Sequence, residues 1–526
     1  MKQKRLSSFP FDKIFFIFAC IFTVVVTYYV TQNCIDSDAS SELVLAQHLA
    51  KTGRILSTDW IYSTELRVFN TQLIYAPLFL IFNSWHMVRF TGALILQAIL
   101  VLSFFAFTRL LKIESKTFFI SASLMLLPIS VCFGRIVLYH SYYVPHIALS
   151  LLIVGLTFTK KYNVIKLSLL GLLSFIGGLG GVRHLLMTHA PIVFAVFIFW
   201  CISDFTAKDK KEAFLLKNWP LISAAVFSAA ASAVGFIINT NYLAEKYTFA
   251  DYSKNTINLL GAEKIKDVLY GFFHHFGFRD EIEIMSVLGV LSVFGILLGI
   301  YCLILAIKGI VEFKTEQDIL KALPYTFFVA FTAVMLTVFL ILDNGYYFVL
   351  YFTPLVVWMI PVFVLEMLKK KDTSFFNLKV LLPYLAVAVI LVNGIANAMY
   401  FTDLRFDQKY EGLKYRNKYR KEEMLAVTEF LEKENYEIGY ATFWNANIVT
   451  EITDGKVKMI GVTVGEYGGQ VERYDWLTLK SNSEIEAEKK FLLLEKSLAT
   501  VFEANNNIDQ CKTVYFDEYF IVYDIP

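Results

Sequence analysis

Two aspartates, Asp36 and Asp38, stand two positions apart in TQNCIDSDASSE, residues 31–42, directly after the first apolar run. The residues DASSELVLAQHLAKTG then repeat leucine and alanine at helical spacing and end at Gly53, which predicts a surface helix beginning near Asp38. Both aspartates would then precede the helix, where residues two apart can converge on one cavity. Such a pair can accept a proton from a sugar hydroxyl or hold a divalent cation, while the simpler alternative makes Asp38 the N-cap of the helix.

The chain that must position these carboxylates is strongly apolar. Of its 526 residues, 56% are hydrophobic and 18% are charged, and the mean hydropathy is +0.55. A soluble protein of this size cannot bury so much apolar surface, so we predict a polytopic membrane protein. The net charge of +2 gives no electrostatic case for a nucleic-acid partner, and the six cysteines show no spacing typical of a disulfide framework or a zinc site.

Windows of about 20 apolar residues predict eleven membrane-spanning helices, the first of them uncleaved. The apolar segment 70–83 is too short for a span and is expected to be interfacial or re-entrant. The predicted spans lie near 14–31, 87–110, 117–134, 144–159, 163–182, 190–205, 219–239, 284–307, 324–342, 346–368 and 378–400.

Lysine and arginine alternate with these spans in a way that predicts the topology. The N-terminal tail and every second connection are short and basic, so the positive-inside rule places the N-terminus in the cytoplasm and the C-terminus outside the cell membrane. Three longer segments, 32–86, 240–283 and 401–526, would then face outward. The first would carry the surface helix with Ser41 and Lys51 on its solvated face, and the second, with His274 and His275, is expected to be a solvated loop.

The segment 401–526 differs from the rest because it is charged and contains no spanning run. Helical spacing over 421–435 and strand patterns over 437–443, 456–464, 513–516 and 519–524 predict a small extracytoplasmic α/β domain. We therefore divide the chain into a transmembrane domain, 1–400, and an extracytoplasmic domain, 401–526.

An N-terminal helix from the inside, an acidic pair and a surface helix closed by Gly53 together resemble the GT-C membrane glycosyltransferases. Relatives in that superfamily include the protein O-mannosyltransferases and the lipid A aminoarabinose transferases. The resemblance covers residues 10–360 in layout and places the family's aspartate on Asp38. Ala39 stands where the family has a glutamate, so Asp36 becomes the candidate for the second carboxylate. The implied fold is a GT-C-like helical membrane protein with about eleven transmembrane helices and a small α/β C-terminal domain.

The resemblance also assigns substrate-binding residues. In GGLGGVRHLLMTHAP, 177–191, Arg183 matches the basic residue that the family presents to the donor phosphate, and His184 follows it; the alternative is an arginine that snorkels to the membrane interface. The other candidates for substrate binding are polar or aromatic residues in predicted outward turns and in the tail, and an aromatic belt or a packed core explains them equally well. They are Arg135, His140, Tyr142, His146, Tyr346 and Trp444.

The resemblance implies an inverting glycosyltransferase of the hexosyl- or pentosyltransferase kind. Its donor would be a polyprenyl-phosphate sugar within the lipid bilayer, and its acceptor an envelope glycan, lipid or protein. Asp38 would be the general base, Arg183 would hold the phosphate, and Asp36 would position the acceptor or share a divalent cation with Asp38, the only cofactor considered.

Two alternatives stay open. A carrier of lipid-linked glycans would need coupling charges inside the membrane, and the predicted spans contain almost no Asp or Glu. A non-catalytic GT-C-like protein of envelope assembly is favoured by Ala39 in place of the glutamate.

Overall fold

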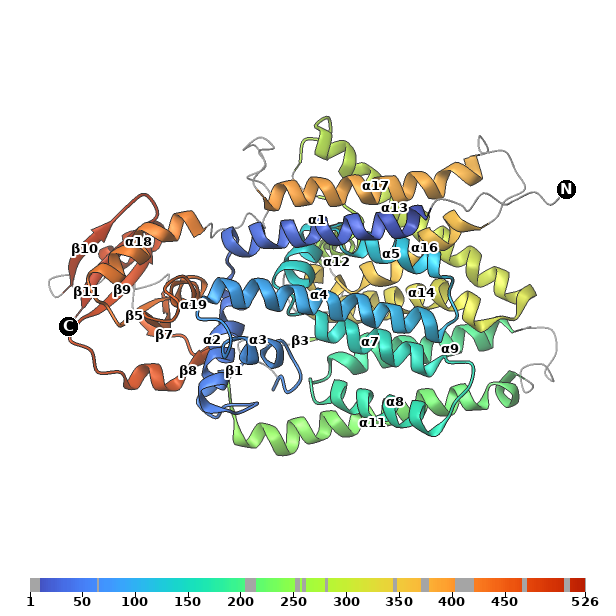
Figure 1. Ribbon diagram of the computed structural model, residues 1–526, viewed down its shortest axis with the longest axis horizontal. Coiled ribbons are helices and arrows are strands. Elements are labelled where there is room, and N and C mark those ends of the chain that lie inside the picture. The colour runs from blue at the N-terminus through green and yellow to red at the C-terminus, as the bar shows by residue number, and fades with distance from the viewer. Residues whose placement is uncertain are drawn as a thin grey trace.

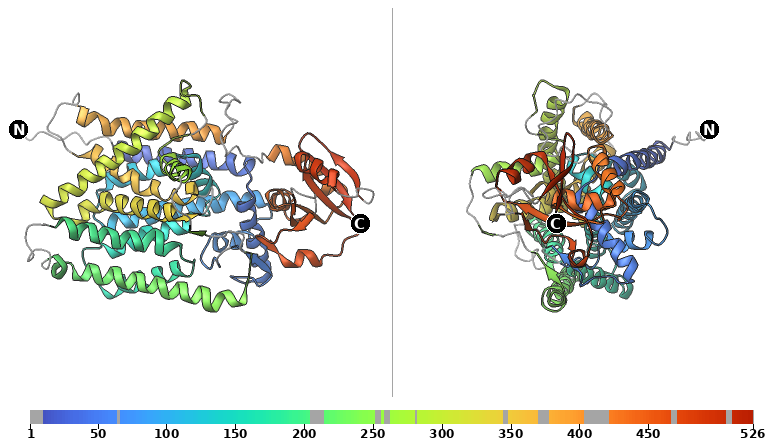
Figure 2. Two further views of the ribbon diagram at one scale, coloured as in Figure 1. Left: turned by 180° about the vertical axis from the view of Figure 1, so that it is seen from behind. Right: turned by 90° about the vertical axis from the view of Figure 1, so that its left-hand side faces the viewer.

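The computed structural model describes residues 10–63, 66–203, 214–250, 256–257, 262–279, 282–343, 348–369, 378–402, 421–465, 471–505 and 511–525. Most helices run side by side in one bundle, and a smaller part rich in strands caps one end of it (Figures 1 and 2). Within the described residues, seven helical stretches are long and apolar enough to cross a membrane, so the chain is a multi-pass membrane protein. They are α1 (Phe11–Asn33), α4 (Trp85–Leu110), η2 with α9 (Leu185–His189 and Ala190–Ile202), α11 (Trp219–Ile238), α13 (Val287–Glu316), α14 (Ile319–Ile341) and α17 (Leu378–Phe401).

The other predicted spans are also helical, but they are shorter or broken. One bent pair, Val131–Tyr139 and Val144–Thr157, turns by 88° and can count as one further span. The 7-residue α3 (Gln72–Leu78) is too short to cross a bilayer, as its sequence led us to expect. The shorter elements are α5 (Ser115–Met125), α6 (Val131–Phe133), the π-helix η1 (Gly134–Tyr139), α7 (Val144–Thr157), α8 (Val164–Gly178), α12 (Ala262–His274), α15 (Phe348–Phe352) and α16 (Leu355–Leu368).

Close packing of the bundle depends on small residues where helices touch. At Gly178 at the end of α8, an added Cβ would lie 2.0 Å from the backbone oxygen of Ser232 on α11, and at Gly235 it would lie 2.3 Å from the oxygen of Phe175. The two backbones therefore pack against each other without intervening side chains, a contact that glycine permits in membrane helices.

The lysine-rich connections gather at one end of the bundle. Lysines from five of the predicted cytoplasmic segments line a single cavity of about 2120 Å³, so these segments share one side of the molecule. The α1 helix also begins at this end, whereas the C-terminal part caps the other (Figure 1). The cavity is lined by Lys112, Lys160, Lys161, Lys217, Lys314, Lys321 and Lys369, among others.

The C-terminal part is built on a six-stranded sheet in the order β10-β11-β9-β5-β6-β7, in which β5 runs parallel to both β6 and β9. The predicted helix and four predicted strands are present as α18, β5, β6, β10 and β11, while β7, β8, η7, β9 and α20 were not predicted. The elements are α18 (Lys421–Lys433), β5 (Ile438–Thr442), α19 (Phe443–Ile452), β6 (Lys458–Val464), β7 (Val471–Arg473), β8 (Thr478–Leu479), η7 (Lys480–Glu484), β9 (Lys490–Glu495), α20 (Lys496–Asn505), β10 (Lys512–Phe516) and β11 (Phe520–Ile525).

This C-terminal part is joined to the first long loop by both strand pairing and helix packing. Strand β8 pairs antiparallel with β1 (Trp60–Tyr62), which in turn pairs with β2 (Thr248–Phe249). Helix α19 packs against α2 (Ser37–Thr52) and covers its first turns. The expectation that Ser41 lies on a solvated face is therefore wrong, because Ser41 is buried, whereas Lys51 is exposed as predicted. The remaining short elements are η3 (Asn239–Leu243), η4 (Ala244–Lys246), β3 (Thr256–Ile257) and β4 (Leu342–Asp343).

Candidate active site

The helix that carries the acidic pair begins one residue earlier than predicted. Asp36 has extended backbone angles, and its Oδ1 accepts hydrogen bonds from the backbone amides of Asp38 at 3.0 Å and Ala39 at 3.2 Å. Asp36 is therefore the N-cap, and Asp38 lies inside the first turn of α2, so the prediction that both aspartates precede the helix is wrong. The other end is as predicted, since Gly53 ends α2 with a φ of 64°, a left-handed conformation that glycine adopts without strain.

The second oxygen of Asp36 forms an ion pair with Arg135, which η1 presents from the bundle. Burial by itself raises the pKa of Asp36, but the charge of Arg135, the nearby His140 and the capped amides outweigh it, and the pKa is lowered from its ordinary value. Asp36 is thus an ionised carboxylate that already has its partners.

Asp38 has the opposite environment. Its side chain is partly buried, and its carboxylate accepts no hydrogen bond from any residue that the structure describes. Burial and the negative charge of Asp36 raise the pKa of Asp38 to about 7, against the opposing effect of Arg135 and Arg67. A carboxylate with a pKa near neutrality and no committed partner is the group of this cluster that can exchange a proton with a bound hydroxyl.

Arg67 and Glu42 belong to this cluster, although the sequence did not single them out. Arg67 Nη1 donates to Glu42 Oε1 at 2.7 Å, and Glu42 Oε2 accepts a second hydrogen bond from Thr71 at 2.5 Å. The Nε atoms of Arg67 and Arg135 are both buried and find no hydrogen-bond partner among the described residues. These two N–H donors lie near Asp38 and have no acceptor among the described residues, so they are suited to an anionic ligand.

Arg183 lies in a wall of aromatic and imidazole rings. Its Nη1 is 3.1 Å from His146 Nε2, and its guanidinium lies over the rings of Tyr143 at 5.4 Å and Tyr351 at 5.9 Å. His146 Nδ1 is in turn 3.2 Å from His184 Nε2. The structure thus brings together three predicted residues, Arg183, His184 and His146. The positive charge of Arg67 acts on both Asp38 and Tyr143, so Arg67 connects this group electrostatically with the acidic pair.

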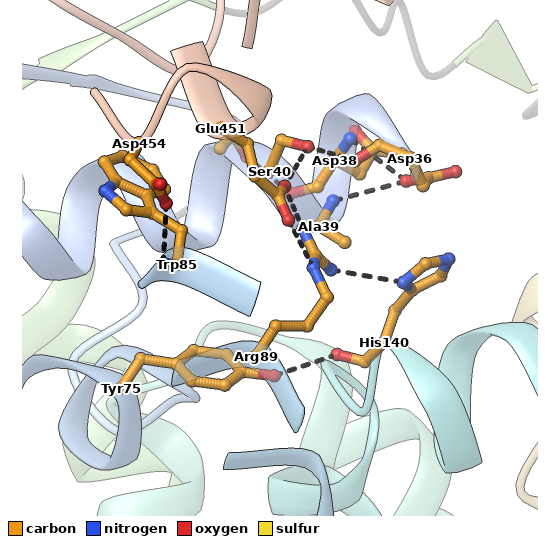
Figure 3. A network of polar contacts seen from close by, with 11 residues as sticks. Asp36, Asp38, Ala39, Ser40, Tyr75, Trp85, Arg89, His140, Glu451 and Asp454 are labelled. Carbon is orange, nitrogen blue, oxygen red and sulfur yellow. Dashed lines mark hydrogen bonds and ion pairs between the residues drawn. The ribbon is translucent and has the colours of Figure 1, made fainter. Parts of the chain in front are cut away.

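A second buried ion pair borders the acidic pair on the side of the C-terminal part. Arg89, the fifth residue of α4, forms a two-point pair with Glu451 of α19, and Arg89 Nη1 lies 3.3 Å from His140 Nδ1 (Figure 3). Ser40 Oγ lies 2.6 Å from Glu451 Oε2. No local pattern singled out Arg89 or Glu451; the one signal available was a lone arginine just inside a predicted apolar span.

The other predicted residues fall into different places. Tyr142 is an electrostatic neighbour of Arg135 and both aspartates, so it belongs to the cluster. Trp444 is 48% exposed and stacks edge-on against Phe443, and no contact recorded for the described residues joins it to the cluster. Tyr346 lies outside the described residues.

The prediction of a solvated loop around His274 and His275 is wrong. Both side chains are buried, and His275 Nδ1 lies 3.1 Å from Ser130 Oγ. Their surroundings are the helix ends of the bundle, because α12 folds back into it and packs against α14 and α15.

A divalent cation shared by Asp36 and Asp38 does not fit this arrangement. Asp36 already binds Arg135 and two backbone amides, so a cation on Asp36 would lie beside the positive charge of a guanidinium. Across the ranges that the structure describes, no three His, Cys, Asp or Glu side chains form a group able to hold a metal ion.

Comparisons with known proteins give a likeness in structure but none in sequence. The chain matches no family model, and no curated protein matches it. The crystal structure of ArnT from Cupriavidus metallidurans bound to undecaprenyl phosphate resembles it with a TM-score of 0.53 at 8% identity, over 98% of each chain. The apo structure of ArnT gives a TM-score of 0.50 at 9% identity, over 97% of each chain. At these identities the likeness establishes a shared fold over nearly the whole length.

Proposed function

We propose that this chain, which has the fold of the GT-C membrane glycosyltransferases, transfers a sugar from a polyprenyl-phosphate donor to a hydroxyl group outside the cytoplasm. The observation that carries the proposal is Asp38, a carboxylate of raised pKa with no committed partner, set among arginines suited to a phosphate. Fold alone does not imply activity, so the proposal depends on this cluster.

The proposed reaction is a single displacement. Asp38 accepts the proton of the acceptor hydroxyl, and the hydroxyl oxygen forms a bond to the anomeric carbon of the donor sugar. The bond from that carbon to the phosphate oxygen breaks, its electron pair stays on the phosphate, and the configuration of the anomeric carbon inverts. The phosphate is a good leaving group, so the reaction needs no general acid.

The arginines have separate roles in this proposal. Arg183, braced by His146 and the two tyrosine rings, binds the donor phosphate and stabilises the charge that develops on it. Arg135 holds Asp36 ionised, and the charge of Asp36 keeps the pKa of Asp38 high enough for Asp38 to act as a base near neutral pH. Tyr142 and His140 complete the wall around the acceptor.

The donor class and the side of the membrane rest on two further observations. The solved structure of ArnT holds undecaprenyl phosphate, which supports a polyprenyl-phosphate donor for a chain of the same fold. The positive-inside rule favours a cytoplasmic position for the lysine-rich end of the bundle, and this supports an outer position for the acidic pair and the C-terminal part. The acceptor is an envelope glycan, lipid or protein.

The test is sugar transfer by the purified full-length chain in lipid nanodiscs. Undecaprenyl-phosphate sugars of the hexose and pentose classes serve as donors, an envelope extract supplies acceptors, and released undecaprenyl phosphate is measured. We expect release with one donor class, and a loss of at least about 100-fold in Asp38→Asn, because a positioned base contributes about that much. Asp475→Asn, which changes an exposed carboxylate, is the control.

Transfer that survives unchanged in Asp38→Asn would refute the role of Asp38. No release with any donor would favour the non-catalytic alternative. The specific observation for that alternative is Ala39, a buried residue whose methyl group cannot replace the carboxylate of the family's glutamate.

A further inference from the structure

Three parts of the chain that are distant in sequence meet at one buried ion pair. Arg89 Nε donates to Glu451 Oε1 at 2.6 Å and Arg89 Nη2 donates to Oε2, which makes a two-point contact between the bundle and the C-terminal part. The side chains of Arg89 and Glu451 are only 1% and 5% exposed. Figure 3 shows both beside the first turn of α2.

The first turn of α2 is attached to α19 at two points. Ser40 Oγ lies 2.6 Å from Glu451 Oε2 and 2.9 Å from the backbone oxygen of Asp36. Ser37 Oγ donates to the backbone oxygen of Phe443. Asp38 lies between these two serines in the sequence. The C-terminal part therefore holds the backbone of α2 both before and after Asp38.

The same ion pair also reaches the turn that faces Asp36. Arg89 Nη1 lies 3.3 Å from His140 Nδ1, and His140 is an electrostatic neighbour of Asp36. One guanidinium therefore connects α19, α4 and the turn after η1.

A buried ion pair of this kind is better explained by geometry than by stability. Removing two charges from water costs about as much as their attraction returns, whereas the two-point contact fixes the relative orientation of the groups. Hydrogen bonds to a charged acceptor are also shorter and about twice as strong as neutral ones.

We infer that Glu451, oriented by Arg89, is a positioning residue through which the C-terminal part holds the first turn of α2 and so places Asp38. The inference rests on the proposed role of Asp38 and adds that the site is incomplete without α19. It assigns the C-terminal part a role in building the site, separate from any contact with an acceptor.

The test uses two variants of the full-length chain and two readouts that need no substrate. Ser40→Ala removes the link to α2 but keeps the ion pair, and Glu451→Gln removes the charge but keeps the shape. Ser123→Ala is the matched control, because Ser123 is also a buried helical serine, bonded at 2.7 Å to the backbone oxygen of Phe119 away from the site. The readouts are amide hydrogen exchange over residues 34–46 and an infrared titration of the Asp38 carboxyl, identified by its loss in Asp38→Asn.

In Ser40→Ala we expect amides of the first turn of α2 to exchange roughly tenfold faster, as loss of one hydrogen bond to a charged acceptor implies. The titration midpoint of Asp38 should move to lower pH, because a loosened turn exposes the carboxyl to water. Glu451→Gln should change both readouts in the same direction. A purely structural role would speed exchange throughout α19 and β5 and leave the midpoint in place.

Unchanged exchange over 34–46 together with an unchanged midpoint in Ser40→Ala would overturn the inference, even if Glu451→Gln fails to fold. Failure of the proposed function looks different, since sugar transfer would then survive in Asp38→Asn whatever the exchange of α2 shows.

Discussion

Replacement of Asp36 by asparagine separates the two roles of this residue. Asparagine is as good an N-cap as aspartate, so α2 should keep its start. The negative charge beside Asp38 is lost, and Arg135 is left without its carboxylate partner. Both changes favour the ionised form of Asp38, so its pKa should fall from about 7.

The size of the shift follows from the repulsion between two neighbouring carboxylates. Two unit charges about 4 Å apart interact by about 4 kcal/mol at an effective dielectric constant of about 20, and the energy falls as they move apart. A change of about 1.4 kcal/mol corresponds to one pKa unit. Asp38 is partly exposed to water, which screens the charge, so we expect a shift of about one unit.

The assay is the pH dependence of sugar transfer in nanodiscs. A base must be deprotonated to act, so transfer by the wild-type chain should rise with pH through a midpoint near 7. In Asp36→Asn the midpoint should lie near pH 6. At pH 6 the variant should therefore reach a fraction of its own plateau rate that is about fivefold larger than the fraction the wild-type chain reaches. Asp475→Asn should keep the wild-type midpoint. A midpoint that stays in place or rises in Asp36→Asn would refute the assignment of Asp38 as the titrating base.

Three further outcomes are expected. Arg183→Ala should weaken undecaprenyl phosphate binding by roughly 10- to 100-fold in a calorimetric titration, with Arg183→Lys in between; equal affinity in all three chains would contradict the phosphate role. Asp38→Asn should raise the apparent melting temperature by a few degrees at pH 8 but not at pH 4. The folded chain keeps the Asp38 proton up to about pH 7, whereas the unfolded chain loses it near pH 3.8. The stability of the wild-type chain therefore declines between these two pH values, and the stability of the variant does not decline in this way. Gly178→Ala should abolish the monodisperse peak in size-exclusion chromatography. Gly53→Ala places its new Cβ in open space, so it should lower the free energy of unfolding by about 1 kcal/mol and remain folded. The reverse order would contradict the packing of α8 against α11.

Local patterns in the sequence accounted for most of the helical layout, and the resemblance to a known family led us to expect the kind of fold that the chain shares with ArnT. Within the described residues, each of the eleven apolar windows lies mainly on helices, and Gly53 ends α2 as its position after an apolar repeat predicted. The cap was placed two residues late because Asp36 and Asp38 are both good caps by residue type. The choice between them depends on the extended backbone of Asp36 and on Arg135, which lies 99 residues away.

The rest of the site could not be read from local patterns because its partners are distant in sequence. Glu451 and Arg89 are 362 residues apart, and each is an ordinary charged residue within its own segment. Arg67 is likewise unremarkable until Glu42 and Asp38 lie beside it. Such pairs follow from the tertiary fold, whereas periodicity and capping report only on neighbours along the chain.

The 411 residues between Ser40 and Glu451 also set an order of events during synthesis. A ribosome adds about 5 to 20 residues per second, so α2 waits roughly 20 to 80 s for the segment that secures it. If Asp38 is the base of the proposed reaction, the nascent polypeptide has no fixed base until this segment has been made and has folded against α2, so sugar transfer should begin only after that point. On the proposed mechanism, a product that ends before Glu451 should therefore lack sugar transfer even when its membrane helices are inserted.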